Sequence, residues 1–287
     1  MSFAENAKEY TFPRPSFFDL NPIFDCGQCF RFEKTSEENV FEGIAYDRYL
    51  RLKQEDNFIT IYGADSCDFE KIWKRYFSLD SDYSLIRQDI AAHFLSDQTI
   101  LSAMEYGKGI RILRQDPWET LCSFILSQNN NIPRIKKLIA SLSEALGNPI
   151  PHGEKMYYSF PSAEALYDAG ETRLYALKTG FRAAYLFDAA KKVRNKEFSL
   201  EELTSVDTPA LLSELMKIKG VGPKVASCVA LFGFGKTDAF PIDVWVKRVL
   251  AKHYPGGLDI AALGNYAGIA QQYLFYYERY SVEKAVS

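Results

Sequence analysis

The sequence has few residues of the kinds that hold metals, and those present are not spaced to share an ion. It contains three histidines and five cysteines in 287 residues. Cys26 and Cys29 form a CxxC in "DCGQCF", but a zinc site needs two further ligands, and neither a second CxxC nor an HxxxH is present. The odd cysteine count follows no disulfide framework, which suits a reducing cytosol. We interpret the CxxC segment as a structural or ligand-lining loop and expect no metal.

Signals for membrane insertion and secretion are also lacking. No uninterrupted apolar run approaches the roughly 18 residues that suggest a membrane span. The opening segment "MSFAENAKEY" does not place a cationic stretch before an apolar one, so no signal peptide is evident. Repeats and low-complexity segments are absent as well. We expect a protein without a membrane contact, located in a prokaryotic cytoplasm rather than in a nucleus.

The sequence has no excess of positive charge. Its formal net charge is −3 and its pI is near 5.8. Taken alone, this argues against nucleic-acid binding, because such proteins are usually basic. Net charge does not settle the question, since binding depends on local patches. Basic clusters that could form such patches lie around 134–137, 191–196 and 247–252.

The first part of the chain has the pattern of an antiparallel sheet. Aromatic and β-branched residues are frequent there and partly alternate with polar ones. The segments concerned are 29–34, 40–54 and 57–63, with short polar stretches between them. A helix is expected over residues 81–95. We assign residues 1–113 to an N-terminal sheet domain.

The remainder of the chain reads as all-helical. Asp116, Pro117 and Glu119 have the residue types of a capping box at a helix start. Amphipathic runs then follow, over 117–127, 133–146, 162–176, 182–195, 208–218, 224–233, 244–253 and 265–280. No strand signal is convincing in this part. We assign residues 114–287 to a helical domain with two subdomains, so the predicted fold class is α+β.

Residues 208–233 predict a helix-hairpin-helix. Two helical runs are joined by the turn Gly220-Val221-Gly222. Gly220 and Gly222 allow positive φ and bring backbone N–H groups close to a ligand, which makes an anion site suitable for a DNA phosphate. A Gly-x-Gly turn by itself is also typical of a plain helical hairpin without a ligand.

Lys224 lies at the start of the second helix of this hairpin. The partial positive charge there disfavours an ammonium by roughly 0.3–1 kcal/mol, and the neutral amine is the nucleophilic form. Cys228 follows four residues later on the same helical face, so we expect the two side chains to share a site. Asp243 opens the next helix, where a carboxylate is stabilised in its ionised form. Alone it would be a helix cap; paired with Lys224 it provides the groups that break a glycosidic bond.

At these residues the sequence resembles a known family. "GVGPKVASC" followed by "PIDVWVKR" resembles the helix-hairpin-helix glycosylases, and within them it is most similar to the 8-oxoguanine DNA glycosylases. The segments "DCGQCFRF", "LRQDPWETLCSFILSQNNNIPRI", "GFRAAYL" and "YAGIAQQYLF" resemble family segments in the same order. The iron–sulfur cysteines of the endonuclease-III-type relatives are absent, so the resemblance implies no cofactor.

The resemblance implies a bifunctional glycosylase and lyase acting as a monomer on duplex DNA. Lys224 would attack the sugar C1′ and form a Schiff base, with Asp243 assisting, and the strand would be cleaved by β-elimination. The backbone carbonyl of Gly27 would accept the N7–H of 8-oxoguanine, a proton that guanine lacks. Gln271 would read the base edge and Phe275 would stack on the base.

Further roles concern the rest of the base pocket and the opposite strand. Cys228 would pack against the other face of the flipped base. Asn129 would fill the gap left by the extruded nucleotide, Arg134 and Arg182 would contact the orphaned cytosine, and Phe181 would wedge into the stack. Such contacts are needed because base flipping costs a few kcal/mol.

Two positions depart from the family pattern, and two other functions stay open. Phe181 stands where many relatives have tyrosine, and Trp245 occupies a position near the DNA phosphates that carries histidine in eukaryotic members. A glycosylase for another damaged purine, such as an alkylated base, is one alternative, although those relatives usually lack the counterpart of Lys224. A non-catalytic DNA-binding scaffold is the other, and the pairing of Lys224 with Asp243 argues against it.

Overall fold

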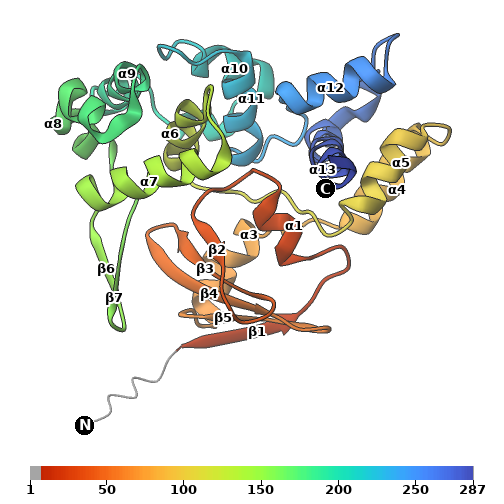
Figure 1. The fold of residues 1–287 in the computed structure, drawn as a ribbon, viewed down its shortest axis with the longest axis horizontal. Coiled ribbons are helices and arrows are strands. Elements are labelled where there is room, and N and C mark those ends of the chain that lie inside the picture. Colours follow the sequence, from red (N-terminus) through yellow and green to blue (C-terminus); the bar gives the residue numbers. More distant parts are fainter. Residues whose placement is uncertain (1–7, 287) are drawn as a thin grey trace.

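The computed structural model describes residues 8–286, with side chains through Tyr280, and places an antiparallel sheet beneath a larger group of helices (Figure 1). The sheet has five strands in the order β1-β5-β4-β3-β2. They are β1 (Glu9–Pro13), β2 (Phe32–Lys34), β3 (Val40–Ala45), β4 (Arg48–Gln54) and β5 (Phe58–Tyr62). The predicted α+β class, with the sheet first in the chain, is confirmed.

The sheet core forms where the buried side chains of the strands pack against four short helical segments. Along β4, buried residues alternate with more exposed ones, and Leu50 and Leu52 are fully buried. Aromatic side chains such as Trp73 and Phe77 complete the same cluster. The helical segments of this layer are α1 (Leu20–Asp25), α2 (Ser66–Asp68), η1 (Phe69–Trp73) and α3 (Lys74–Tyr76). Strand β1 escaped the sequence analysis because only Phe12 is buried in it, which leaves no alternating pattern to read.

The helices form a second core. They are α4 (Tyr83–His93), α5 (Gln98–Tyr106), α6 (Pro117–Ser127), α7 (Ile132–Leu146), α8 (Ala163–Leu174), η2 (Tyr175–Thr179), α9 (Arg182–Arg194), η3 (Glu202–Ser205), α10 (Thr208–Leu215), α11 (Pro223–Phe232), α12 (Val244–His253), η4 (Ala261–Tyr266) and α13 (Ala267–Val286). Within residues 8–286, none of them combines the length and apolar character needed to span a bilayer.

Packing does not follow the order of the chain. Helices α4 and α5 precede the predicted domain boundary, yet Ile90, Ile100 and Met104 are buried in the same cluster as Tyr273 of α13. Figure 1 shows the two helices beside the C-terminal helix, on the far side from α8 and α9. The boundary between residues 113 and 114 stays a prediction, because two segments before it belong to the helical core.

A short β-hairpin interrupts the helical part, so the expectation of no strands after residue 114 was wrong. Strands β6 (Pro149–His152) and β7 (Lys155–Tyr158) pair antiparallel and extend from the helices toward the sheet (Figure 1). The His152 ring stacks on Tyr49 of β4 with centroids 3.8 Å apart, and Lys155 lies 3.3 Å from the Glu42 carboxylate of β3. Each strand has only four residues, and β6 contains two prolines, so the sequence carries no strand signal here. Contacts with the five-stranded sheet stabilise the hairpin instead.

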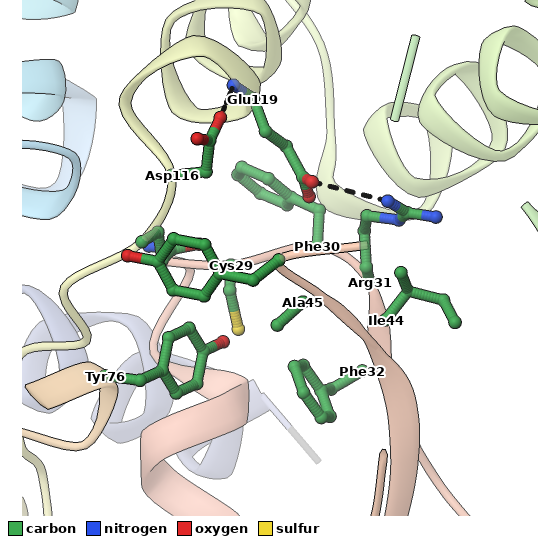
Figure 2. Close-up of a pocket in the computed structure, with 11 residues that line it drawn as sticks. Cys29, Phe30, Arg31, Phe32, Ile44, Ala45, Tyr76, Asp116 and Glu119 are labelled. Carbon is green, nitrogen blue, oxygen red and sulfur yellow. Dashed lines mark hydrogen bonds and ion pairs between the residues drawn. The ribbon is translucent and has the colours of Figure 1, made fainter. Parts of the chain in front are cut away.

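The start of α6 forms only half of the expected capping box. The Asp116 carboxylate accepts a hydrogen bond from the Glu119 amide at 2.8 Å, as predicted. The Glu119 side chain instead pairs with Arg31 at 3.3 Å (Figure 2), and Arg31 also donates to the Tyr158 carbonyl. Burial raises the pKa of Glu119 to about 7, although the Arg31 charge opposes this. These contacts join the loop after α1, helix α6 and the β6–β7 hairpin around a small cavity that Cys29 also lines.

Arg111, in the segment between α5 and α6, binds the two cores together. Arg111 is only 3% exposed, and its guanidinium lies 4.4 Å from the centroid of the Tyr83 ring. The guanidinium donates to the backbone carbonyls of Ser16 (3.0 Å), Phe17 (3.2 Å), Ser78 (2.9 Å) and Ser81 (3.3 Å). Two loops of the sheet layer are therefore held by one side chain.

We expect Arg111→Lys to destabilise the protein by about 2–4 kcal/mol, because an ammonium cannot reach these carbonyls in a fork geometry and leaves several of them buried without a donor. Urea denaturation at neutral pH measures the change. Arg114→Lys is the matched control, since Arg114 pairs with Asp80 at a partly exposed site and should lose less than about 1 kcal/mol. Equal losses for both variants would contradict the role given to Arg111.

Candidate active site

Lys224 is the second residue of α11 and turns toward α6. Its Nζ lies 3.3 Å from the Ser127 hydroxyl oxygen and 5.2 Å from the centroid of the Phe124 ring. Lys224 is half-buried, and Gly222 caps its helix with Pro223 at the first position. The amine is therefore held between two helices rather than left in solvent.

Cys228 shares this site, as the helical spacing predicts. The residue is buried, and burial raises the pKa of its thiol to about 11, with the Lys224 charge opposing the shift. The thiol is consequently protonated at neutral pH. Lys224 thus has a neutral, polarisable neighbour one turn along its own helix.

Asp243 caps α12 and faces the same site. Its carboxylate accepts hydrogen bonds from the amides of Trp245 (3.0 Å) and Val246 (2.8 Å). Burial raises the pKa of Asp243, while these amides and the Lys224 charge lower it. The amide hydrogen bonds of the helix start favour the ionised form, as expected, and burial opposes them with the larger effect. The Lys224 charge acts in the same direction as the amides and lowers the pKa of Asp243.

The hairpin turn is docked onto α9. Gly220 has φ +79°, and a Cβ there would lie 2.3 Å from the Tyr185 ring. The Asp188 carboxylate accepts from the Lys219 amide at 2.8 Å and pairs with Lys192 at 2.6 Å. Gly222, by contrast, has ordinary extended backbone, and a Cβ there would meet nothing within 4 Å. The first glycine is thus required by packing, and the second leaves open space beside the start of α11.

Three of the expected base-pocket residues lie on the loop after α1 and on α13. Gly27 has φ +73°, and a Cβ on it would be 3.4 Å from the Phe275 ring and 3.7 Å from Ile132. Gln271 lies one turn before Phe275 and is 3% exposed. Within the described residues, its buried side-chain oxygen has no hydrogen-bond partner. An amide oxygen in a buried position needs a donor, which a water molecule or a polar ligand can supply.

The loop carrying Asn129 is held by Arg182. Asn129 has φ +51°, a left-handed conformation that asparagine tolerates. The buried Arg182 guanidinium donates to the carbonyls of Gln128 (2.9 Å), Asn129 (3.3 Å) and Thr179 (3.2 Å). Burial lowers the pKa of Arg182, with the charge of Arg134 adding to the effect. Arg182 thus supports the loop; its predicted contact with cytosine stays a prediction.

The other expected DNA contacts lie at the surface. Phe181 is 52% exposed and stands edge-on to Tyr185 at 5.7 Å. Arg134 is exposed near the start of α7. Trp245 is half-buried, with the Arg248 guanidinium 4.6 Å from its ring centroid. An exposed aromatic ring and nearby cations suit contacts with stacked bases and phosphates.

Several site residues escaped the sequence analysis. Ser127 and Phe124 contact Lys224, although they lie almost 100 positions earlier in the chain. Their i, i+3 spacing would have placed them on one face of α6. Tyr185 and Asp188 carry no local signal, because a tyrosine and an aspartate on a helix usually face solvent.

Two family models match the chain in succession. Residues 12–121 match the 8-oxoguanine DNA glycosylase N-terminal domain, and residues 122–257 match the HhH-GPD superfamily of base excision DNA repair proteins. The N-glycosylase/DNA lyase of Saccharomyces cerevisiae is 34% identical in an alignment of 265 positions that covers 82% of this chain and 68% of the yeast protein.

Solved structures are similar over nearly the whole chain. MBOgg1, in complex with a low-affinity DNA ligand, has a TM-score of 0.91 and 41% identity, covering 97% of this chain and 98% of that one. The 8-oxoguanine glycosylase/lyase of Clostridium acetobutylicum, in complex with double-stranded DNA containing cytosine opposite 8-oxoguanine, has a TM-score of 0.89 and 37% identity, covering 96% of both chains.

The two hairpin glycines should respond differently to substitution. We expect Gly220→Ala to destabilise the protein by about 1–3 kcal/mol, because the new methyl group meets Tyr185 and the residue must keep a left-handed backbone. Gly222→Ala serves as the control and should change stability by less than about 0.5 kcal/mol, since nothing occupies its surroundings. Thermal and urea unfolding measure both. A larger loss for Gly222→Ala would contradict the docking of the turn on α9.

The raised pKa of Asp243 predicts a specific pH dependence of stability. The folded state binds a proton more tightly than the unfolded state, so the carboxylate makes folding less favourable as pH rises above about 4, the ordinary value for aspartate. Asp243→Asn keeps the cap and removes the titration. We expect the stability of this variant relative to wild type to increase between pH 3 and pH 7.

Urea unfolding at several pH values across this range tests the prediction. Asp207→Asn is the matched control, because Asp207 caps α10 through the Ala210 amide at an exposed helix start. It should show no such increase. A pH-independent difference for Asp243→Asn would show that burial does not dominate at this carboxylate.

Proposed function

The chain belongs to the 8-oxoguanine DNA glycosylase/lyase family of base excision repair, and from this premise we propose that Lys224 is its nucleophile and Asp243 the carboxylate that assists it. The observation that carries the proposal is the convergence of two helix starts. The amine of Lys224 is held against Ser127, and Asp243 interacts with it from the start of α12. The family membership and the sheet domain matched at residues 12–121 favour 8-oxoguanine over an alkylated purine as the substrate.

Lys224, Asp243 and water are sufficient for this chemistry, so we propose no cofactor. Water supplies the protons taken up by the base and by the ring oxygen and accepts those lost from nitrogen and from C2′. The lone pair on the Lys224 amine forms a bond to C1′ of the nucleotide, and the base leaves with the electron pair of the glycosidic bond and takes up a proton. The Asp243 carboxylate stabilises the positive charge that develops on the sugar. Loss of a proton from nitrogen and opening of the sugar ring give a Schiff base. Removal of a C2′ proton then expels the 3′ phosphate, which cleaves the strand.

We propose that the base is read in the pocket between the Gly27 loop and α13. The Gly27 carbonyl would accept the N7–H of 8-oxoguanine, and guanine would present a lone pair to the same acceptor. The unpaired, buried side-chain oxygen of Gln271 and the Phe275 ring against Gly27 support this assignment. Cys228 would contact the opposite face of the base from α11.

Protein residues that contact the opposite strand would support extrusion of the base. Asn129 would enter the gap, Arg134 and Arg182 would contact the orphaned cytosine, and Phe181 would wedge beside it. The hairpin turn with Gly220 and Gly222, and the surface near Trp245, would bind the phosphates. We propose a prokaryotic cytoplasmic location, at the nucleoid, rather than a nuclear one. The alignment with the Clostridium acetobutylicum glycosylase/lyase, which covers 96% of both chains, supports this.

Borohydride trapping on a duplex with one 8-oxoguanine opposite cytosine tests the proposal. We expect the wild-type protein to form a covalent adduct, because borohydride reduces a Schiff base to a stable amine. Lys224→Gln should form none, since an amide cannot attack C1′. Lys217→Gln, which alters an exposed lysine just before the turn, is the control and should retain the adduct.

The remaining outcomes separate the parts of the proposal. Base release by the wild-type protein without an adduct would assign another nucleophile and remove the role of Lys224. An adduct that persists in Lys224→Gln would have the same consequence. Asp243→Asn should slow trapping by at least about tenfold, because each 1.4 kcal/mol of lost transition-state stabilisation is a factor of ten.

A further inference from the structure

The backbone carbonyls around Gly27 form an unusual series. Those of Asp25, Cys26 and Gln28 each accept a hydrogen bond from a side chain elsewhere in the protein: Arg279 (3.1 Å), Gln272 and Gln115 (2.7 Å), respectively. Among the described residues, no group donates to the carbonyl of Gly27 itself. The carbonyls before and after it are therefore anchored, and Gly27 is the position left available for a ligand.

The two amide donors on either side of Gly27 come from different parts of the fold. Gln272 is 2% exposed on α13, next to Gln271 in sequence. Gln115 lies just before α6. Its backbone N–H donates to the Phe232 carbonyl of α11 at 2.9 Å. On one side, the Gly27 loop is therefore hydrogen-bonded to α13, the helix expected to read the base. On the other side, Gln115 connects it to α11, the helix that carries Lys224.

Gln28 completes the anchoring from within the loop. It is 1% exposed, and its side chain donates to the carbonyls of Ile23 and Arg111, both at 2.9 Å, and accepts from the Leu113 amide at 2.8 Å. All of these bonds are buried, where an unpaired partner costs roughly 1–3 kcal/mol. Any shift of the Gly27 carbonyl therefore has to break bonds on both sides of it.

We infer that Gln272 and Gln115 are positioning residues that set the selectivity for the oxidised base by fixing the Gly27 carbonyl between two anchored neighbours. The inference rests on the proposed role of that carbonyl. An acceptor discriminates an N–H from a lone pair only when its position is fixed, because a loop that can move relieves the repulsion from guanine. Gln272 and Gln115 do not contact the base in this assignment; they act through Cys26 and Gln28.

Two activities of the same protein separate positioning from general structural damage. Release of 8-oxoguanine uses the Gly27 carbonyl, whereas cleavage at a preformed abasic site presents no base to it. Under single-turnover conditions, opposite cytosine, we expect Gln272→Met to slow release of 8-oxoguanine roughly tenfold. Cleavage of the abasic duplex should stay within about twofold of wild type, because Lys224 and Asp243 are untouched.

A binding measurement gives the selectivity directly. In a Lys224→Gln background, which prevents turnover, the ratio of affinities for duplexes with 8-oxoguanine and guanine opposite cytosine should fall roughly tenfold on adding Gln272→Met. Gln115→Met is the second variant and should shift both measurements in the same direction, since it frees the carbonyl on the other side of Gly27. Thr60→Val is the matched control: it removes one side-chain hydrogen bond of a buried residue, to Thr11 in the sheet, and should change neither ratio.

The outcomes are distinct. Equal losses of base release and abasic cleavage in both variants would show a structural role only and overturn the inference, as would unchanged selectivity in both. If the wild-type protein itself releases no 8-oxoguanine, the proposed function fails and the inference falls with it. Selective loss of base release in either variant, with abasic cleavage and the Thr60→Val control unchanged, establishes positioning through the anchored carbonyls.

Discussion

Buried side-chain donors that bond to loop carbonyls hold the functional segments of this protein in place. The segments around Gly27 and Asn129 have no regular hydrogen bonding of their own, and a buried carbonyl without a donor costs roughly 1–3 kcal/mol. Gln272 supplies such a donor to the Gly27 loop, and Arg182 supplies one to the Asn129 loop. Arg111 does the same for the loops that join the sheet to the helices. The geometry of the site therefore depends on donors that do not themselves react.

In the proposed active site, burial and hydrogen bonding act on the side chains in opposite directions. Asp243 gains two amide hydrogen bonds and a nearby cation, yet burial still raises the pKa of its carboxylate. A carboxylate in this state is not fully compensated by the protein, so it interacts more strongly with positive charge that develops beside it than a solvated carboxylate would. Cys228 contributes no competing charge, because burial keeps its thiol protonated. In the proposed mechanism the Asp243 carboxylate is therefore the anion that acts on the amine and on the sugar.

Local patterns in the sequence predicted the parts of the site that depend on local structure. The helix starts at Lys224 and Asp243 follow from residues within a single turn, and helix α11 begins one residue before the predicted run. The anchoring of Gly27 could not be predicted, since Gln272 and Cys26 are 246 positions apart. The β6–β7 hairpin was missed for a related reason, because its stabilising contacts come from the sheet and not from its own residues. The effect of burial on Asp243 could not be predicted, because burial is a property of the whole fold.

Helix α9 shows why the two DNA-facing surfaces have to be considered together. Its first residue, Arg182, holds the Asn129 loop, and Asp188, six residues further on, holds the hairpin turn through the Lys219 amide. At 1.5 Å per residue the helix separates these attachments by about 9 Å. The loop proposed to fill the gap in the stack and the turn proposed to bind phosphates are therefore attached to one rigid element. Since base extrusion costs a few kcal/mol, contacts on both surfaces have to form in the same complex, and a common helix fixes their spacing before DNA binds.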